Sequence, residues 1–393
     1  MPLAAPLPPH YFKCPPLCKD DIDHFVELGS RSMQAVVKKA NLKGGAYDWK
    51  LLKDESELKI YKAYNAADDS HLHCGVMQVV GDLDENMALH RDDTTEQARE
   101  YIQRFGRVYA DVVNLYTVVP RHPDRPNDAV QIKWFPGKSP LDGVVTRRDF
   151  VMLETEMEFQ VDGKRAWVRS YSSIELAAVP DMRKELGCIR ASMYDTGFVV
   201  VESDRPGYLH MTYLDDMDVK GHAPAWVIDT TLKFWLRSMH DIDRFMRENR
   251  LSRTLFLKTD QLYPLHSRRS CALCRRKFGP LRKKTHCQKC GEVLCTSCNR
   301  LWNVNLNGVD AQVLVCLTCS LSTCTVRMAG RDSRFDSSRA QDVLETSAAT
   351  WSMDTLIQAP PLDYDDDTLS DNLSSFSDSE LGSVPRPITL YHP

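Results

Sequence analysis

Apolar residues recur at spacings of three and four from Lys19 onward, which is the periodicity of an amphipathic helix. The face that they form consists of Ile22, Phe25, Val26, Met33, Val36 and Val37. Asp20 and Asp21 stand in the predicted first turn, where carboxylates complement the helix dipole. An amphipathic helix is therefore the first predicted element of the chain.

Segments rich in Val, Tyr, Phe and Met follow, and they have the length and composition of β-strands. The first three predicted strands cover residues 47–52, 58–64 and 72–80, and two short helices are predicted at 83–91 and 94–105. Five or six further strands are predicted at 110–119, 129–135, 144–159, 165–174, 189–202 and 207–214. Asp162 and Gly163 form the predicted hairpin turn between two of them.

A long helix closes this block, and Pro224 suits its first turn, where a missing N–H group has no helical partner to lose. Its apolar stripe consists of Ile228, Leu232, Trp235, Met239, Ile242 and Met246. A stripe of this kind must pack against other apolar side chains. The pattern thus predicts one α+β domain, in which a curved antiparallel sheet is crossed by a long final helix.

The order of these elements resembles that of START-type lipid-transfer domains over roughly residues 20–249. Two short phrases carry the resemblance further: Arg148-Asp149-Phe150, and Asp218-Val219-Lys220-Gly221 followed by Pro224 and Trp226. The resemblance implies a helix-grip fold with an elongated apolar cavity for a lipid, walled by the stripe of the final helix. The alternative is that the stripe fills a solid core, so the lipid-cavity residues remain unknown. Four polar residues either meet a lipid head group or form buried ion pairs: Arg148, Asp149, Arg169 and Arg190.

Eight cysteines form four Cys-x-x-Cys pairs, and each pair turns both sulfurs toward one point. The pairs are Cys271/Cys274, Cys287/Cys290, Cys295/Cys298 and Cys316/Cys319. Each pair is half of a tetrahedral zinc site, so the four pairs predict two Zn²⁺ ions whose binding contributes to folding. A disulfide framework is typical of secreted chains, and the proline-rich start does not have the pattern of a secretion signal. A redox motif would need only one such pair.

The cysteine spacing resembles that of the FYVE finger closely over about residues 270–320. The gaps between successive cysteines are two, twelve, two, four, two, seventeen and two residues, and Phe278, Gly291 and Leu294 also match. The resemblance implies a cross-brace, with one zinc held by Cys271, Cys274, Cys295 and Cys298 and the other by Cys287, Cys290, Cys316 and Cys319. A RING finger is the main rival, but it typically has a histidine ligand in the middle, whereas here His286 is left free.

FYVE fingers bind phosphatidylinositol 3-phosphate through a WxxD stretch, an R(R/K)HHCR strand and an RVC end, and this chain keeps only part of each. Leu262 and Leu265 occupy the Trp and Asp positions. The central strand reads Lys283-Lys284-Thr285-His286-Cys287-Gln288, and the end reads Leu314-Val315-Cys316. Lysine binds phosphate as a point charge without the bidentate geometry of arginine, so these changes weaken specific recognition of the 3-phosphate.

A general attraction to anionic membrane is still predicted for this segment. The candidate head-group and membrane residues are Leu281, Arg282, Lys283, Lys284 and His286. Each basic residue near an acidic leaflet contributes roughly 1 kcal/mol. The alternative is that the basic side chains only solvate the segment and balance the zinc-bound thiolates. Nucleic-acid binding is disfavoured, because we identify no recognition helix with base-reading side chains.

Charge separates the last two parts of the chain. Residues 266–320 contain ten Lys or Arg against two acids, whereas residues 321–393 contain five against twelve. The acidic, serine-rich tail cannot bury enough apolar surface to order itself, so we predict that it is disordered. Its candidate phosphorylation sites are Ser374, Ser375, Ser377 and Ser379. No apolar run in the sequence reaches the roughly 18 residues that a membrane span requires.

These observations divide the chain into a proline-rich start (1–18), a START-like domain (19–250), a linker (251–265), a FYVE-related finger (266–324) and the acidic tail (325–393). The leading hypothesis is a cytoplasmic, non-enzymatic protein. Its first domain holds a lipid, and its finger docks peripherally on an anionic or phosphoinositide-containing membrane such as that of the endosome. The second hypothesis makes the finger a protein-interaction module, as in effectors of small GTPases, with the START-like domain as a scaffold. The scattered histidines show no nucleophile–base arrangement, so no catalytic residue is assigned.

Overall fold

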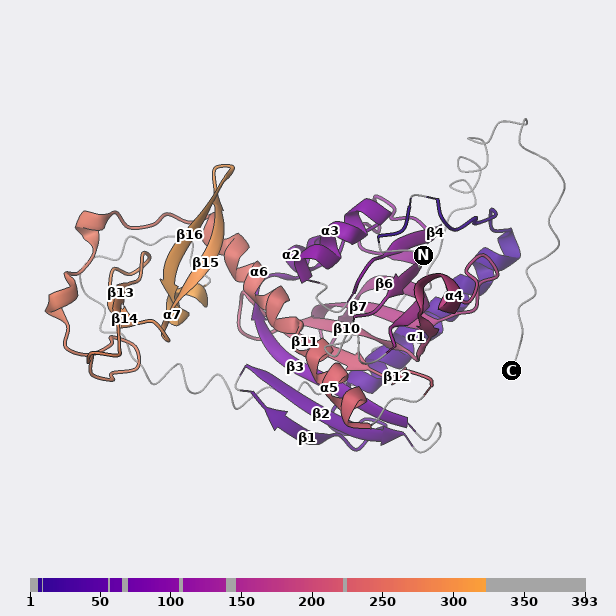
Figure 1. The fold of residues 1–393 in the computed structure, drawn as a ribbon, viewed down its shortest axis with the longest axis horizontal. Helices are drawn as coiled ribbons and strands as arrows, with labels where there is room; N and C mark the ends of the chain where they lie inside the picture. The colour runs from indigo at the N-terminus through magenta and orange to yellow at the C-terminus, as the bar shows by residue number, and fades with distance from the viewer. Residues whose placement is uncertain are drawn as a thin grey trace.

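The computed structural model describes residues 6–8, 10–55, 57–65, 70–105, 109–138, 146–221 and 225–322 (Figure 1). Pro224, the predicted disordered tail and its candidate phosphorylation sites lie outside these residues. Within the described residues, no helix is long and apolar enough to cross a membrane. The described chain forms a large sheet with its helices, followed by the cysteine-rich finger.

Helix α1 (Lys19–Ala40) confirms the first predicted element. Its first turn carries Asp20 and Asp21, and the carboxylate of Asp21 accepts a hydrogen bond from the backbone N–H of Cys18 at 3.1 Å. The predicted apolar face is buried against the sheet, except that Val26 is only half-buried. The helix lies over β4 to β7 and over β10 and β11, so it packs on one face of that part of the sheet.

The strands of the main sheet pair antiparallel in the order β1-β2-β3-β11-β10-β7-β6-β5-β4. Their bounds are β1 (Lys50–Asp54), β2 (Leu58–Asn65), β3 (Ser70–Val80), β4 (Val113–Val119), β5 (Ala129–Pro136), β6 (Arg148–Val161), β7 (Lys164–Ser173), β10 (Thr196–Glu202) and β11 (Tyr208–Asp215). The predicted hairpin turn joins β6 to β7, with φ of +50° at Asp162 and +74° at Gly163. Both residues thus have the left-handed backbone that a tight hairpin turn requires.

The predicted strand at 189–202 is divided into three short pieces. These are β8 (Ile189–Arg190), which pairs parallel with β6, then β9 (Ser192–Met193) and β10. β9 pairs instead with β12 (Met217–Asp218). Asp195 separates β9 from β10 and has a φ of +48°, which a continuous strand does not allow. A one-turn helix that the pattern did not predict, α4 (Arg183–Leu186), precedes β8.

Alternate residues of the strands point to opposite faces of the sheet. On β10, Val199 belongs to the core beneath α1, whereas Phe198 and Val200 belong to the core on the other side. This second side, the inner face, packs against α2 (Leu83–Leu89), α3 (Thr95–Phe105), α5 (Ala225–Leu236) and α6 (Met239–Ser252). Figure 1 shows α5 and α6 crossing the sheet. The α+β fold with an antiparallel sheet gripping a C-terminal helical segment is therefore confirmed.

The predicted long final helix is present as two helices, because regular helix is interrupted at Arg237 and Ser238. The hydroxyl of Ser238 donates a hydrogen bond to the carbonyl of Trp235 at 2.7 Å, which competes with continuation of α5. The guanidinium of Arg237 forms a bidentate ion pair with Glu55, with Nε 3.0 Å from Oε2. The junction is thereby held to the chain that leaves β1.

The predicted stripe of this segment packs on the inner face. Leu232, Trp235, Met239, Ile242 and Met246 are buried, whereas Ile228 is only half-buried. The approach of α6 to β3 is close at Gly75, where a Cβ atom would lie 2.9 Å from Sδ of Met239. A larger residue at this crossing would require the flexible side chain of Met239 to move.

The finger begins with two short 3-10 turns, η1 (Thr259–Gln261) and η2 (Leu265–Ser267). Two hairpins and a one-turn helix follow: β13 (Lys284–His286), β14 (Val293–Cys295), β15 (Asn299–Leu306), β16 (Val309–Cys316) and α7 (Leu317–Ser320). Its small apolar core contains Trp302, Val304, Val313 and Val315, together with Leu251 from the end of α6. Apart from the cysteines, the finger thus has little buried apolar surface.

Helix α6 binds the finger through the edge of β15. Glu248 Oε1 accepts a hydrogen bond from the backbone N–H of Asn303 at 2.9 Å, and Ser252 Oγ accepts one from Asn305 at 2.9 Å. Four residues of helix rise about 6 Å. Two residues of strand extend about 6.6 Å, so the two spacings match. One face of α6 therefore packs on the sheet while another face pairs with the finger.

Candidate metal centre and ligand cavity

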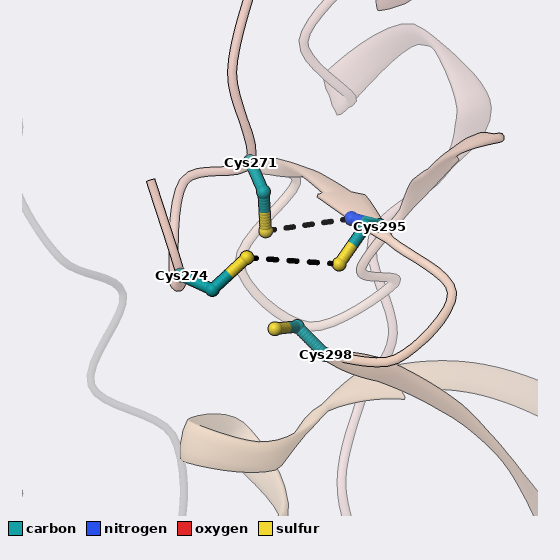
Figure 2. A group of neighbouring side chains, drawn as sticks. All are labelled: Cys271, Cys274, Cys295 and Cys298. Carbon is teal, nitrogen blue, oxygen red and sulfur yellow. Dashed lines mark hydrogen bonds between the residues drawn. The ribbon is translucent and has the colours of Figure 1, made fainter. Parts of the chain in front are cut away.

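The side chains of Cys271, Cys274, Cys295 and Cys298 converge on one point in the finger (Figure 2). Their sulfur atoms all lie within 4.8 Å of one another, and Sγ of Cys274 is 3.8 Å from Sγ of Cys295. A tetrahedral zinc ion with Zn–S bonds of about 2.3 Å places its sulfurs about 3.8 Å apart. The donor set and its geometry therefore fit Zn²⁺.

A second group of four sulfurs lies within 4.8 Å of one another and consists of Cys287, Cys290, Cys316 and Cys319. Backbone N–H groups donate to these sulfurs, for example from Cys316 to Sγ of Cys287 at 3.3 Å. Along the chain, pairs of the first group alternate with pairs of the second. The arrangement is thus the cross-brace that the resemblance implies, and the two four-cysteine groups fit two zinc ions.

Local backbone geometry turns the cysteines toward the metal positions. Gly291 has a φ of +76° directly after Cys290, and Arg275 has a φ of +60° directly after Cys274. These left-handed residues close the tight turn that brings both sulfurs of a pair together. Burial raises the pKa of Cys271, but N–H donors from Cys295 and other neighbours outweigh that effect and lower it to about 7. Such donors favour the thiolate, which is the form that binds zinc.

Three of the predicted head-group residues line an open groove of 650 Å³ on the finger: Arg282, Lys283 and Lys284. Leu281 beside them is fully exposed. The ammonium of Lys284, however, donates hydrogen bonds to the carbonyls of Leu265 at 3.0 Å and Arg268 at 2.9 Å. Its charge is therefore partly engaged within the finger.

Two other positions of the FYVE motif also make contacts within the finger. Nε2 of His286 lies 2.7 Å from the carbonyl oxygen of Tyr263. Gln288, which stands where the family has the last arginine of its strand, accepts a hydrogen bond from the backbone N–H of Leu314 at 2.7 Å. Gln288 thus ties the central strand segment to β16 and offers no positive charge to a phosphate.

Inside the large domain, a small cavity of 30 Å³ lies between the inner face and the helices α3, α5 and α6. Its lining is mostly aromatic: Tyr101, Phe105, Tyr109, Tyr171, Phe198, Tyr213 and Trp235, with Ser238 and Ile242. A second cavity of 50 Å³ lies near the start of α5, between Val227, Ile228 and Phe150, with Arg148 at its edge. Each space has room for only one to a few waters.

The polar residues of this domain form buried ion pairs. Arg169 is buried, and its Nη2 lies 2.7 Å from Oδ2 of Asp92. Lys133 Nζ lies 2.7 Å from both Asp92 and Glu154. Glu156 pairs with Arg121 Nη2 at 3.0 Å, but burial still raises its pKa to about 7. The acids Asp92, Glu154 and Glu156 also cluster as metal ligands would, yet three cations neutralise them.

Of the other three predicted polar residues, Arg148 and Asp149 begin β6 and Arg190 lies on β8. Oδ2 of Asp149 accepts hydrogen bonds from Arg190 at 2.8 Å and from the indole of Trp134 at 2.8 Å. Arg148 donates to the carbonyls of Val219 and Lys220, both at 2.9 Å. Within the described part of the domain, all four polar residues thus have partners from the protein itself.

Asp215, at the end of β11, was not identified from the sequence. It is 1% exposed, and neither carboxylate oxygen has a hydrogen-bond partner among the described residues. Burial, and to a smaller extent the charge of Asp216, raise the pKa of Asp215 to about 7. The sequence did contain a signal for this position. Met211, Tyr213 and Asp215 are alternate residues of one strand, so their side chains project to the same face of the sheet. An acid in such an inward position needs a partner.

We expect the buried state of Asp215 to make stability depend on pH. Its pKa is about 7 in the folded chain, against an ordinary value of 3.8, so between these values only the folded state holds the proton. Stability should therefore fall as pH rises from about 4 to 7, by about 2 to 4 kcal/mol. In Asp215→Asn, the free energy of unfolding measured with denaturant should not show this fall between about pH 4 and 7. The control is Asp218→Asn on the exposed end of β12, which should follow the wild-type profile.

The comparisons with known proteins agree with both parts of this structure. A family model of the START domain matches residues 28–235, and one of the FYVE zinc finger matches residues 262–325. Both are typically non-enzymatic modules. Among curated proteins, 1-phosphatidylinositol 3-phosphate 5-kinase FAB1 of Saccharomyces cerevisiae is 36% identical over 53 residues. The match covers 14% of this chain and only 2% of that kinase.

Solved structures similar to this chain include two human proteins. Human StAR-related lipid transfer protein 5 has a TM-score of 0.45 and 12% identity over 57% of this chain and 96% of its own. Human STARD10 has a TM-score of 0.39 and 16% identity over 60% of this chain and 81% of its own. The START model covers more than half of the sequence. The chain therefore belongs to the START domain family and carries a zinc-binding FYVE finger behind its lipid-binding domain.

Proposed function

We propose that the START domain holds one lipid while the finger docks the protein peripherally on an anionic, phosphoinositide-containing membrane of the endosomal system. The observation that carries the docking part is the position of Leu281. This side chain is fully exposed beside a groove lined by Arg269, Lys277, Arg282 and Lys283. An apolar tip within a basic rim is the arrangement that enters the interface of an acidic leaflet.

The groove is suited to attract any anionic lipid and, among the described residues, has no group placed to recognise a phosphate at one position of the inositol ring. Arg282 and Lys283 line it, whereas Lys284 is engaged by two carbonyls and Gln288 is neutral. Lysine does not hold a phosphate in bidentate geometry. We therefore infer that binding follows the total negative charge of the membrane more than the isomer of the phosphoinositide.

Lipid binding by the START domain requires the inner cavity to expand. Sites for ligands of ordinary size have about 300–1,000 Å³, whereas the cavity beneath α5 and α6 has 30 Å³. The break at Arg237 and Ser238 divides the covering segment into two rigid helices. We infer that α5 moves about this junction to admit the lipid, because α6 is held by the finger as well as by the sheet.

Replacing Leu281 by aspartate should abolish most of the vesicle binding. The change removes the exposed apolar tip and places a negative charge against an anionic surface, so the apparent affinity should fall about tenfold or more. Flotation of the zinc-loaded full chain with vesicles containing phosphatidylserine and phosphatidylinositol 3-phosphate measures it. Val309→Asp is the matched control, because Val309 is an exposed apolar residue at the start of β16.

The control should float like the wild type. Equal loss in both variants would mean that the finger responds to charge anywhere on its surface, and the proposed docking tip would be wrong. If the wild-type chain itself does not float with acidic vesicles, membrane docking fails and a protein partner becomes the better explanation of the finger.

A further inference from the structure

Asp215 differs from the other buried acids of the START domain in having no ion-pair partner among the residues that the structure describes. Asp92 and Glu154 are paired with Lys133 and Arg169, and Asp149 is paired with Arg190. Neither oxygen of Asp215 receives a hydrogen bond from the described residues. An unpartnered buried carboxyl group costs free energy, so its presence calls for a partner that arrives from outside the chain.

The position of Asp215 places it beside the aromatic cavity. It follows Tyr213 by two residues on β11, so both side chains project to the inner face. Tyr213 lines the cavity and stacks on Phe198 with ring centroids 4.3 Å apart. Asp215 is also close enough to Tyr109, another lining residue, to shift its pKa upward.

A donor without a partner lines the same cavity. Nε1 of Trp235 is buried and has no acceptor among the described residues. Trp235 packs against Tyr109, with ring centroids 5.8 Å apart, and belongs to α5, the helix that covers the cavity. His73 faces Asp215 across the β3–β11 pair, and its Nδ1 is also unpaired while Nε2 lies 3.3 Å from Asp229 of α5. Among the described residues, unpartnered polar atoms of both kinds thus occur on residues that line this cavity or adjoin its lining.

We propose that Asp215 receives the buried polar end of the START ligand, and that this ligand is a neutral lipid ending in a hydroxyl group. The proposal rests on the proposed function, in which the START domain holds a lipid. A hydroxyl group donates to a carboxylate and accepts from an indole N–H, so it satisfies Asp215 and Trp235 together. Above about pH 7, where Asp215 is ionised, a lipid that buries a carboxylate or phosphate end here would meet the acid with like charge and leave it without a donor.

Asp215 and Arg169 have different roles in the domain, because Arg169 already has partners from the protein. The guanidinium of Arg169 already contacts Asp92 and Glu154, at 2.7 Å and 2.9 Å. Its Cζ atom also lies over the rings of Tyr101 and Tyr171, 5.5 Å from each centroid. The Arg169 network therefore holds the sheet to the segment after α2, and the ligand-facing acid is Asp215.

The test compares two fluorescent probes on the zinc-loaded full chain: a pyrene-labelled long-chain alcohol and the carboxylic acid of the same length. The wild type should bind the alcohol at least about tenfold more tightly than the acid, because a hydrogen bond to a buried carboxyl group is lost with the wrong end group. Asp215→Leu should lower the alcohol affinity about tenfold or more. The same variant should resist denaturant better than the wild type, because it no longer buries an unpaired acid.

Thr212→Val is the matched control. Thr212 is a buried residue of the same strand with an unpartnered hydroxyl, but it points to the opposite face, beneath α1. Its replacement should leave the binding of both probes unchanged. Asp215→Asn keeps the side-chain volume and provides a second variant. Its affinity for the alcohol probe should be lower than that of the wild type by more than about threefold.

The outcomes distinguish this proposal from the one on which it rests. A wild-type chain that binds neither probe and carries no lipid would overturn lipid holding and this proposal together. A wild-type chain that binds the alcohol while both Asp215 variants bind it equally well would overturn only the role of Asp215. A joint loss of stability and binding in both Asp215 variants would show a structural role and would also overturn it.

Discussion

Replacing Cys287 by serine should unfold the finger and leave the START domain folded. Sγ of Cys287 is buried and accepts hydrogen bonds from the N–H groups of Lys289 and Cys316 at 3.4 Å and 3.3 Å. Structural zinc contributes on the order of 10 kcal/mol to the folding of small fingers. Loss of one ligand therefore removes more free energy than the few apolar residues around Trp302 supply.

Native mass spectrometry should find at most one zinc ion on the Cys287→Ser chain, and limited proteolysis should cut between residues 266 and 322. The control is Cys18→Ser, at an exposed cysteine outside both groups of sulfurs. It should keep both metals and the wild-type cleavage pattern. A Cys287→Ser chain that retained two zinc ions and resisted protease would show that this sulfur is not a ligand.

Unfolding of the finger should also remove the contacts that α6 makes with β15. This helix presents Met239, Ile242 and Met246 to the sheet and presents Glu248 and Ser252 to β15. The first contacts are apolar and buried, so they persist when the finger unfolds. The second set is lost, which frees only the last turns of α6. Zinc binding in the finger is thus linked to the START domain through α6, and also through the hydrogen bond that the hydroxyl of Tyr208 on β11 donates to the carbonyl of Leu321 at 2.8 Å.

The sequence predicted the features that depend on local pattern. The cysteine spacing indicated both zinc sites, and the periodicity from Lys19 indicated α1 with its buried face. The Asp162-Gly163 turn was visible because few residue pairs tolerate left-handed backbone at both positions. Each of these features lies within a few residues of the side chains that cause it.

Features that depend on distant partners were not predicted. The final helix is interrupted at Ser238, whose hydroxyl acts locally, but the junction is fixed by Glu55, which is far away in the sequence. Likewise, an apolar stripe has the same sequence pattern whether it covers a solid core or a cavity. The sequence alone therefore left the lining of the cavity unassigned.

The same limit applies to charged residues. Lys284 and His286 were predicted as head-group residues from their motif positions, but each contacts a backbone carbonyl within the finger. Arg169 and Asp215 are both buried and ionisable, and the structure gives them different surroundings. Arg169 has three acids beside it, whereas neither oxygen of Asp215 has a hydrogen-bond partner in the described part of the chain. The pairing of strands decides which charged side chains become neighbours, and the composition of a sequence does not predict that pairing.

Arg169→Leu should destabilise the START domain by about 3 to 5 kcal/mol, which is the usual cost of removing one partner from a buried ion pair. The variant leaves Asp92, Glu154 and Glu156 in the core with Lys133 and Arg121 as their remaining cations. Burial already raises the pKa of Glu156 to about 7. Without Arg169 beside it, the pKa of this acid should rise above that value, so the loss of stability should be smallest at and below about pH 7 and should grow at higher pH.

Urea unfolding followed by circular dichroism measures this effect, with Arg165→Leu as the matched control. Arg165 lies on the same strand and also pairs with two acids, Asp84 and Glu158, but its side chain is 38% exposed. Exposed ion pairs contribute at most about 1 kcal/mol, because water solvates the separated charges nearly as well. Equal losses in the two variants would mean that water reaches Arg169. Its network would then not be the buried support of the inner face that its geometry indicates.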